Sequence, residues 1–177
     1  MLKSQDCVVL VKLIAHANRS WSLRELAEET CISLSEVHSG INRLAKAKLI
    51  RKSAGTQIGP TPILAAAEEY LIHGLKYSFP AQLGEYTRGI STGIGAPAFK
   101  GLLVASDEPM PVWPDARGDK KGSSLLPLYS SIPQSIREYP DPVFYNLLTM
   151  IDVIRSGRAR ERQIAINLLK KTINHEK

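Results

Sequence analysis

Apolar residues recur at helical spacing through the first 75 residues, with short polar turns between the periodic stretches. This pattern predicts a helix over residues 5–17, because apolar side chains three or four positions apart lie on one face. It also predicts a short helix that ends near Thr30 and a third that ends near Ala47. A fourth predicted helix covers residues 61–73, and Gly74 is expected to end it, since glycine favours the position after a helix.

Two of these helices begin with the same capping signature. Ser22 is followed by Glu25, and Ser33 by Glu36, so each serine can accept from a free backbone N–H while the glutamate reaches back. Two short helices so close together predict a tight turn around Cys31, where such turns usually carry glycine. The pattern is typical of a helix-turn-helix, and the short strand and turn predicted over residues 49–55 would form its wing.

The third predicted helix has an apolar face and a polar face. At about 100° per residue, its apolar positions point to one side, namely Leu34, Val37, Ile41 and Leu44. The opposite side carries small polar side chains, an asparagine and a lysine, with His38 and Arg43 at its borders. Asparagine can pair with adenine and arginine with guanine, while lysine and serine hold phosphates. This face is either a solvated surface or, as we predict, the part of the helix that enters the major groove of DNA.

The predicted DNA-binding residues continue from this helix into the wing. Those expected nearest the bases are Ser35, Ser39, Asn42 and Arg43, and those expected on the phosphate backbone are Lys46, Arg51 and Lys52. With His38 the full set is Ser35, His38, Ser39, Asn42, Arg43, Lys46, Arg51 and Lys52. Glu36 is the only acidic residue between positions 34 and 52, so the stretch favours an anionic partner.

Residues 76–140 have a different pattern, with most of the chain's prolines and only short apolar runs. We expect short strands and loops there, including a hairpin across the charged turn at residues 115–122. Asp141-Pro142 then predicts a helix start, and a last basic helix follows Gly157. The expected fold class is therefore α+β, with an N-terminal winged helix-turn-helix (1–75), a short-stranded middle section (76–140) and a helical C-terminal end (141–177).

Charge and composition narrow the function classes. The chain has 23 basic and 17 acidic residues, a net charge of +6, and the excess lies at its two ends. The two cysteines and four histidines lack the spacing of metal ligands or of a disulfide framework, which favours a reducing, cytoplasmic compartment. The apolar stretches are too short to span a membrane. We expect no metal and no cofactor.

An enzyme is the last alternative. The acidic pairs Asp107-Glu108 and Asp115 with Asp119 lie in turns rich in proline and glycine, where solvated charge is expected. The glycines of residues 89–95 lack the ending of a phosphate-binding loop. The arginines of residues 157–163 either grip an anion or spread around a helix and pair with nearby acids. None of these motifs predicts a catalytic site.

The chain resembles bacterial MarR-like winged-helix regulators over residues 5–75. It is also similar to a group of small bacterial winged-helix proteins through a series of short motifs: Tyr70-Leu-Ile-His-Gly74, Tyr77-Ser-Phe-Pro80, Thr87-Arg-Gly89, Pro111-Val-Trp-Pro114, Pro127-Leu-Tyr129, Asp141-Pro142 and Gly157-Arg-Ala-Arg-Glu-Arg162. The resemblance implies a transcriptional regulator, and some members are similar to antitoxins encoded beside nucleotidyltransferase-type toxins.

Two kinds of partner besides double-stranded DNA follow from these patterns. The apolar residues of the last two predicted helices fold onto the domain or build a homodimer, which we expect because a two-fold pair doubles the DNA site. The alternative function is an antitoxin-like interaction module that neutralises a co-encoded protein through residues 76–177.

Overall fold

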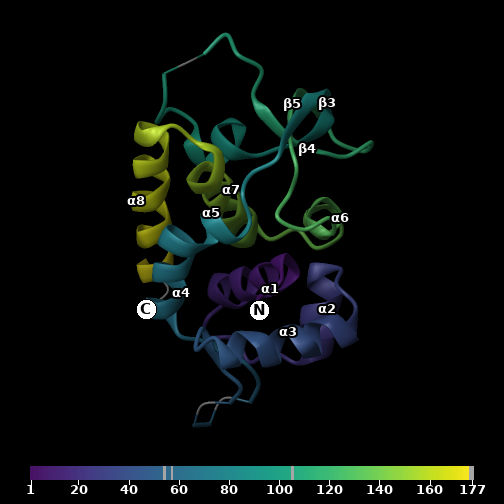
Figure 1. Ribbon diagram of the computed structural model, residues 1–177. Helices are drawn as coiled ribbons and strands as arrows, with labels where there is room; N and C mark the ends of the chain where they lie inside the picture. Colours follow the sequence, from purple (N-terminus) through teal and green to yellow (C-terminus); the bar gives the residue numbers. More distant parts are fainter. Residues whose placement is uncertain (54, 57, 105, 176–177) are drawn as a thin grey trace.

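Helix α1 (Ser4–Ala15) lies at the centre of the fold, between α3 on one side and α7 on the other (Figure 1). The computed structural model describes residues 1–53, 55–56, 58–104 and 106–175. Every residue of α1 from Asp6 to Ala15 is buried, which accounts for the nearly continuous apolar run at residues 7–15. A helix that is apolar on all sides needs neighbours on all sides, and α1 therefore organises the core.

Helices α2 (Leu23–Thr30) and α3 (Leu34–Lys46) follow α1 and agree with the predicted helices. The capping box of Ser22 and Glu25 is complete. Ser33 also caps α3 by accepting from the N–H of Glu36, but the Glu36 carboxylate accepts from the side chain of Gln5 on α1 (2.9 Å). The second predicted box is thus formed by its serine, and its glutamate serves a tertiary contact.

Strands β1 (Ile50–Arg51) and β2 (Thr61–Pro62) form a two-stranded antiparallel hairpin after α3. Helix α4 (Leu64–Glu69) begins next, continues as a π-helical turn (η1, Tyr70–Gly74) and ends as α5 (Leu75–Ser78). The prediction that Gly74 ends this helix is wrong. A Cβ at Gly74 would lie 2.7 Å from the Tyr70 ring, so the glycine is needed for packing rather than for a helix end.

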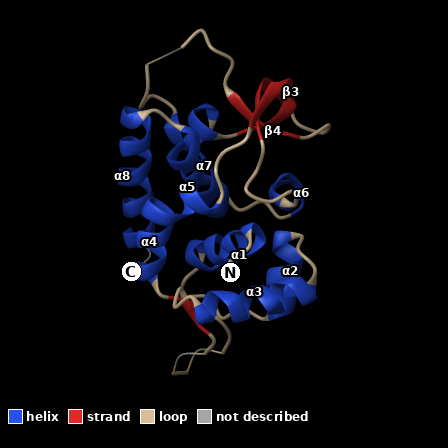
Figure 2. Ribbon diagram, in the orientation of Figure 1, coloured by secondary structure: helices blue, strands red, loops and turns tan. Residues whose placement is uncertain are grey.

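The middle section forms a small closed barrel of three strands, β3 (Leu83–Ser91), β4 (Pro111–Pro114) and β5 (Lys120–Leu125), drawn in red in Figure 2. The 3-10 turns η2 (Gly93–Gly95) and η3 (Pro97–Phe99) follow β3. The predicted hairpin across residues 115–122 is wrong, because β4 and β5 pair in parallel. Strand β3 is long enough to pair with both of them, antiparallel in each case.

Three helices complete the chain. Helix α6 (Ile132–Glu138) was not predicted from the sequence, while α7 (Pro142–Ser156) and α8 (Ala159–His175) begin close to the predicted residues. Asp141 caps α7 by accepting from the N–H of Phe144 (3.1 Å). The mixed α+β class is thus confirmed.

One apolar cluster runs through all three segments of the chain. It includes the residues of α7 that we considered for a dimer interface, which are Leu147, Leu148, Ile151 and Ile154. On α8, Ala165, Leu169 and Ile173 are buried against the same cluster. The sequence left open whether these side chains fold onto the domain or build a homodimer, and the structure shows that they pack within their own chain.

Candidate nucleic-acid interface

Helix α3 and the β1–β2 hairpin lie at one end of the molecule with α2 beside α3, and α1 and then α7 lie on the inner side of α3 (Figure 1). The inner face of α3 buries Val37, Gly40, Ile41 and Leu44. Its outer face is therefore directed away from the rest of the fold. No helix or strand of the described residues covers that face, so a partner as large as a DNA duplex can reach it.

Most of the predicted DNA-binding residues lie on this outer surface. Those of α3 that are exposed are Ser35, His38, Asn42 and Lys46, and Ser39 is half-buried among them. Arg51 of β1 and the following Lys52 are also exposed. Lys48, in the turn between α3 and β1, is an exposed cation that extends the same row.

The cations of this surface lack acidic partners in the part of the chain that the structure describes. Among the described residues, no ion pair engages Lys46, Lys48, Arg51 or Lys52. By contrast, Lys12 and Arg19 near the other side of α2 are held by Glu29 at 2.9 Å each. The end of the molecule formed by α3 and the hairpin thus carries uncompensated positive charge, which attracts polyanions.

Two left-handed residues set the geometry of this surface. Cys31, in the turn between α2 and α3, has φ of 54°, and Lys48, after α3, has φ of 62°. At both places the chain leaves a helix by bonding back to it: Ile32 N–H donates to Ala27 O (3.1 Å), and Leu49 N–H donates to Leu44 O (3.1 Å). This is the helix ending that glycine usually occupies, and it confirms the tight turn predicted around Cys31.

Arg43 does not lie with the other predicted residues. Its guanidinium donates to both oxygens of the Asp6 carboxylate, from Nε (2.7 Å) and Nη2 (2.8 Å), and Asp6 is fully buried. The hydrogen bonds to Asp6 raise the pKa of Arg43 above its ordinary value. A guanidinium held in this way by a carboxylate is not presented to a guanine, so the geometry assigns Arg43 to the attachment of α3 to α1.

Two residues that the sequence analysis did not assign to the surface belong to it. Leu34, expected on the apolar face of α3, is 49% exposed, and Arg24 of α2 lies next to it. Together with Leu23 and three polar residues of α3 they line a shallow hollow between the two helices; those polar residues are Ser35, His38 and Ser39. Leu34 is the first residue of α3, where helical periodicity says little about burial because the preceding residue is not helical.

A second cluster of charges lies inside the molecule and joins α1 to α7. Lys12 is fully buried and donates to Asp141 (2.7 Å), which also contacts His16 Nε2 (2.6 Å). Burial acts to raise the pKa of Asp141, but hydrogen bonds from Lys12, the Phe144 N–H and His16 outweigh it and hold the pKa below its usual range. Lys12 also pairs with Glu29 of α2 (2.9 Å), so this cluster ties α1 both to α2 and to the start of α7.

A third polar cluster lies beneath the barrel. Asp152 of α7 is buried and accepts from Thr92 Oγ1 (2.7 Å), Trp113 Nε1 (2.7 Å) and Arg155 Nη1 (2.9 Å). Burial raises the pKa of Asp152 despite these donors. All of its partners come from β4, α7 and the chain just after β3, so this carboxylate anchors the barrel to the helices.

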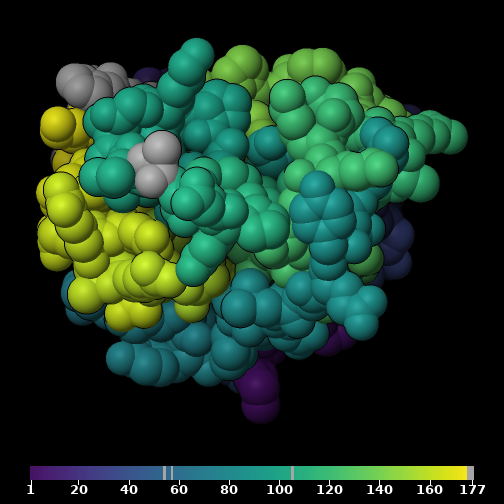
Figure 3. Space-filling view, turned by 90° about the horizontal axis from the view of Figure 1, so that it is seen from above, coloured from purple at the N-terminus to yellow at the C-terminus, as the bar shows by residue number. Residues whose placement is uncertain are grey.

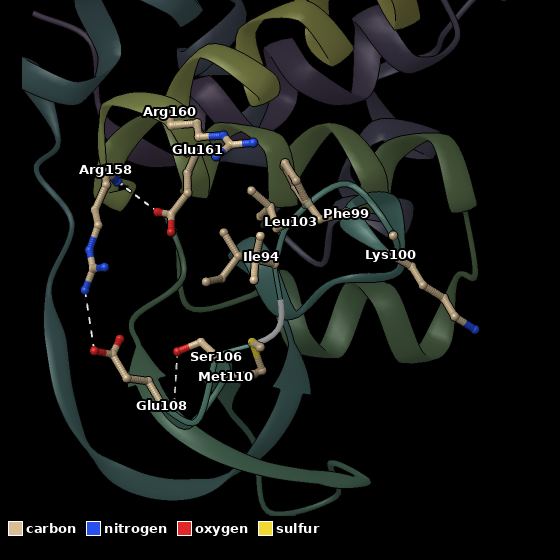
Figure 4. A pocket seen from close by; sticks show the side chains of 12 residues that line it. Ile94, Phe99, Lys100, Leu103, Ser106, Glu108, Met110, Arg158, Arg160 and Glu161 are labelled. Atoms are coloured by element: carbon tan, nitrogen blue, oxygen red, sulfur yellow. Dashed lines mark hydrogen bonds and ion pairs between the residues drawn. The ribbon is translucent and has the colours of Figure 1, made fainter.

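The pocket of Figure 4 lies between the start of α8 and the chain that follows η2. Its wall is apolar, with Ile94, Phe99, Leu103 and Met110, and its rim is charged. On that rim Arg158 contacts Glu108 (3.4 Å), and its N–H donates to Glu161 (2.9 Å). The Arg158 guanidinium is thus paired with Glu108, whereas Arg160 and Lys100, which also line the pocket, form no ion pair among the described residues.

The remaining motifs are dispersed. Asp115 pairs with Arg137 (2.8 Å), whereas Asp119 is exposed. Arg162 donates to the carbonyls of Ile154 and Gly157, so the arginines near the start of α8 point in different directions. Within the described part of the chain, no three His, Cys, Asp or Glu side chains are grouped as metal ligands, and no helix has the length and apolar character to cross a membrane.

Comparisons with protein-family models, with curated proteins and with solved structures found no significant match to this chain.

Proposed function

We propose that the protein is a sequence-specific regulator that binds duplex DNA through a winged helix-turn-helix made by residues 1–75. Helix α3 would enter the major groove, and the β1–β2 hairpin would act as the wing along the backbone. The observation that carries the proposal is a row of exposed cations beside the polar outer face of α3, which form no ion pair with any described residue: Lys46, Lys48, Arg51 and Lys52.

The residues of this surface have distinct roles in the proposal. Asn42 is exposed in the middle of the outer face and has the donor and acceptor pair that adenine recognition requires. Ser35 and Ser39 lie one turn apart beside it, within reach of base edges or phosphates. The cations hold the phosphate backbone, and each contact makes binding weaker as salt rises. Arg43 acts as a positioning residue through Asp6.

The experiment is a binding titration by fluorescence anisotropy. Its probes are a duplex from the region upstream of the protein's own gene and a scrambled duplex of equal length, each over a salt series. We expect tighter binding to the first duplex at moderate salt. Equal and salt-labile binding to both, or no binding, would contradict sequence-specific regulation.

Charge-matched variants separate the interface from general attraction. Lys46→Gln with Lys52→Gln removes two charges from the proposed surface, and Lys170→Gln with Lys171→Gln removes two exposed charges from α8. Each lost phosphate contact lowers the slope of log K against log salt by about 0.9, so the first pair should lower it by about two. The α8 pair should leave the slope unchanged, whereas equal effects of both pairs would indicate attraction by net charge alone.

A homodimer remains part of the proposal, since two copies of α3 would read two half-sites. Because the apolar side chains of α7 are inside the chain, the contact would have to use other surfaces. Sedimentation with and without DNA tests this, and a single protein copy on a bound duplex would contradict it.

A second candidate function is supported by an apolar surface on the barrel side of the molecule. Leu83 (75%), Tyr86 (63%) and Leu126 (44%) are exposed on or beside β3 and β5, and the Leu126 N–H donates to Gln82 O, next to Leu83. The end of the molecule opposite α3 is formed largely by the middle section (residues 76–140) and α8 (Figure 3). Leu83 and Leu126 are thus brought together by this backbone hydrogen bond, and neighbouring exposed apolar side chains favour a protein partner.

This interaction-module hypothesis has a direct test. The chain is co-expressed with the protein encoded by the neighbouring gene, and the complex is measured by size-exclusion chromatography. Leu83→Ser with Tyr86→Ser should abolish it, while Lys46→Gln with Lys52→Gln should leave it intact. A complex that survives the first pair of substitutions would contradict this surface.

A further inference from the structure

The hollow between the starts of α2 and α3 combines apolar and cationic side chains on the surface proposed to meet DNA. Leu23 and Leu34 are the first residues of their helices, and both line the hollow. Leu23 packs partly against the core, but Leu34 is not part of the core cluster and is 49% exposed. A large aliphatic side chain is thus held at the surface among polar neighbours.

The rim of the hollow is complementary to DNA in charge. It carries Arg24, His38 and the hydroxyls of Ser35 and Ser39, and no acidic side chain lines it among the described residues. Arg24 and His38 take part in no ion pair among those residues. An acidic or purely apolar protein segment would use only part of this surface, whereas a DNA duplex presents phosphates and base edges together.

Only one apolar group projects from base pairs into the major groove, and that is the C5-methyl group of thymine. Recognition helices of this class enter the groove with their N-terminal residues nearest the bases. Leu34 is at the N-terminus of α3. If Ser35, Ser39 and Asn42 reach the base edges, the Leu34 side chain would lie at the same depth in the groove.

We propose that Leu34, backed by Leu23, contacts a thymine methyl group and makes the protein require thymine at that position of its site. The inference rests on the proposed DNA binding, and it adds an apolar contact by which the protein would recognise one base. The hydroxyl groups and Arg24 around Leu34 would fix the neighbouring phosphates, so that the methyl group is directed into the hollow.

The test replaces thymine by uracil, which removes the methyl group and keeps the base pair. Duplexes enriched by the wild-type protein from a random pool are amplified with either dTTP or dUTP, and the Kd of each is measured. Burying one methyl group corresponds to about a fourfold change in Kd, so wild-type protein should prefer thymine duplexes by about fourfold for each contacted methyl. Single thymine-to-uracil replacements then locate the position.

Variants assign the effect to Leu34. Leu34→Ala should bind thymine and uracil duplexes alike, and because Leu34 lies outside the core cluster it should fold normally, which circular dichroism checks. Leu34→Met keeps an apolar contact and should keep the preference. Lys52→Gln should weaken both duplexes equally and leave the ratio unchanged.

Each outcome decides the inference. Equal wild-type affinity for thymine and uracil duplexes overturns it while leaving DNA binding intact. A preference that persists in Leu34→Ala overturns the assignment to this residue. Failure to enrich any duplex overturns the inference together with the proposed function, and the three results are distinguishable.

Discussion

Arg43 and Asp6 form a two-pronged ion pair that fastens α3 to the first turn of α1, with the Arg43 Nε 2.7 Å and Nη2 2.8 Å from the carboxylate oxygens. Gly40, one turn before Arg43, permits this approach, because a Cβ there would lie 2.8 Å from Asp6 Oδ1. The pair therefore determines how α3 is rotated about its axis and which of its residues face outward.

Arg43→Ala is expected to lower the free energy of unfolding by about 3 kcal/mol, because it leaves the buried Asp6 carboxylate without its charged partner. Denaturant unfolding measures the loss. Adding Asp6→Asn should recover part of it, since no buried charge then remains. If Arg43→Ala proves as stable as wild type but loses DNA specificity, Arg43 reads bases after all.

The second prediction concerns stability in acid. The pKa of Asp141 is held below its ordinary value near 3.8, so the unfolded chain takes up the proton first as pH falls. The stabilisation is full above about pH 5 and is lost as pH falls through 3.8 towards the lower folded-state pKa. Asp141→Asn should be less stable at pH 7, because Lys12 loses a partner, and should show a flatter decline between pH 5 and 3.

Unfolding free energies at pH 7, 5, 4 and 3 provide the measurement. Asp107→Asn, at an exposed carboxylate, is the control and should follow the wild-type profile. An unchanged acid profile in Asp141→Asn would show that this carboxylate does not control acid unfolding.

The third prediction uses the left-handed Cys31. A residue with a Cβ is strained at φ of 54°, and glycine is not, so Cys31→Gly should raise the free energy of unfolding by about 0.5 kcal/mol. Cys31→Ala keeps the strain and should give no gain. Thermal unfolding of the three proteins compares them, and a Cys31→Gly protein less stable than Cys31→Ala would contradict the strain.

The fourth prediction concerns the hairpin. Gly59 has φ of 106°, and a Cβ there would overlap the carbonyl oxygen of Trp21. Gly59→Ala should therefore destabilise the protein by about 2–3 kcal/mol or more through strain and the displaced backbone. Gly55 also has a positive φ, of 61°, but a Cβ there would have no neighbour within 4 Å.

Gly55→Ala is thus the matched control. It should lower the free energy of unfolding by only about 1 kcal/mol, because alanine is strained at a positive φ but meets no neighbouring atom there. The two variants are compared by denaturant unfolding. Equal losses would mean that the contact with Trp21 does not hold the hairpin against the helices.

The elements predicted correctly are those set by neighbouring residues. Ser22 and Asp141 cap their helices with N–H groups only three positions away. The chain reversal at Cys31 is also local, because its backbone hydrogen bonds return to the last turn of α2. Such contacts can be read from spacing because the partner is always at the same separation along the chain.

The elements missed depend on distant partners. Gly74 has the composition of a helix end, yet the Tyr70 ring occupies the space beside it and the helix continues. The turn after β4 has the composition of a hairpin, yet the length of β3 lets it pair with both strands and makes β4 and β5 parallel. Helix α6 has no strong periodicity of its own, and its Ser135 hydroxyl donates to Glu29 O of α2.

In the proposed interface, some features of α3 follow from the sequence alone and others were decided only by the tertiary structure. The sequence alone specified that α3 has a polar side carrying Ser35, Asn42 and Lys46, because helical geometry converts spacing into faces. Whether a side chain at the border of that side points outward or inward depended on the fold. The buried Asp6 draws Arg43 inward, and the lack of a core neighbour leaves Leu34 outside, since burial and charge pairing act between residues that only folding brings together.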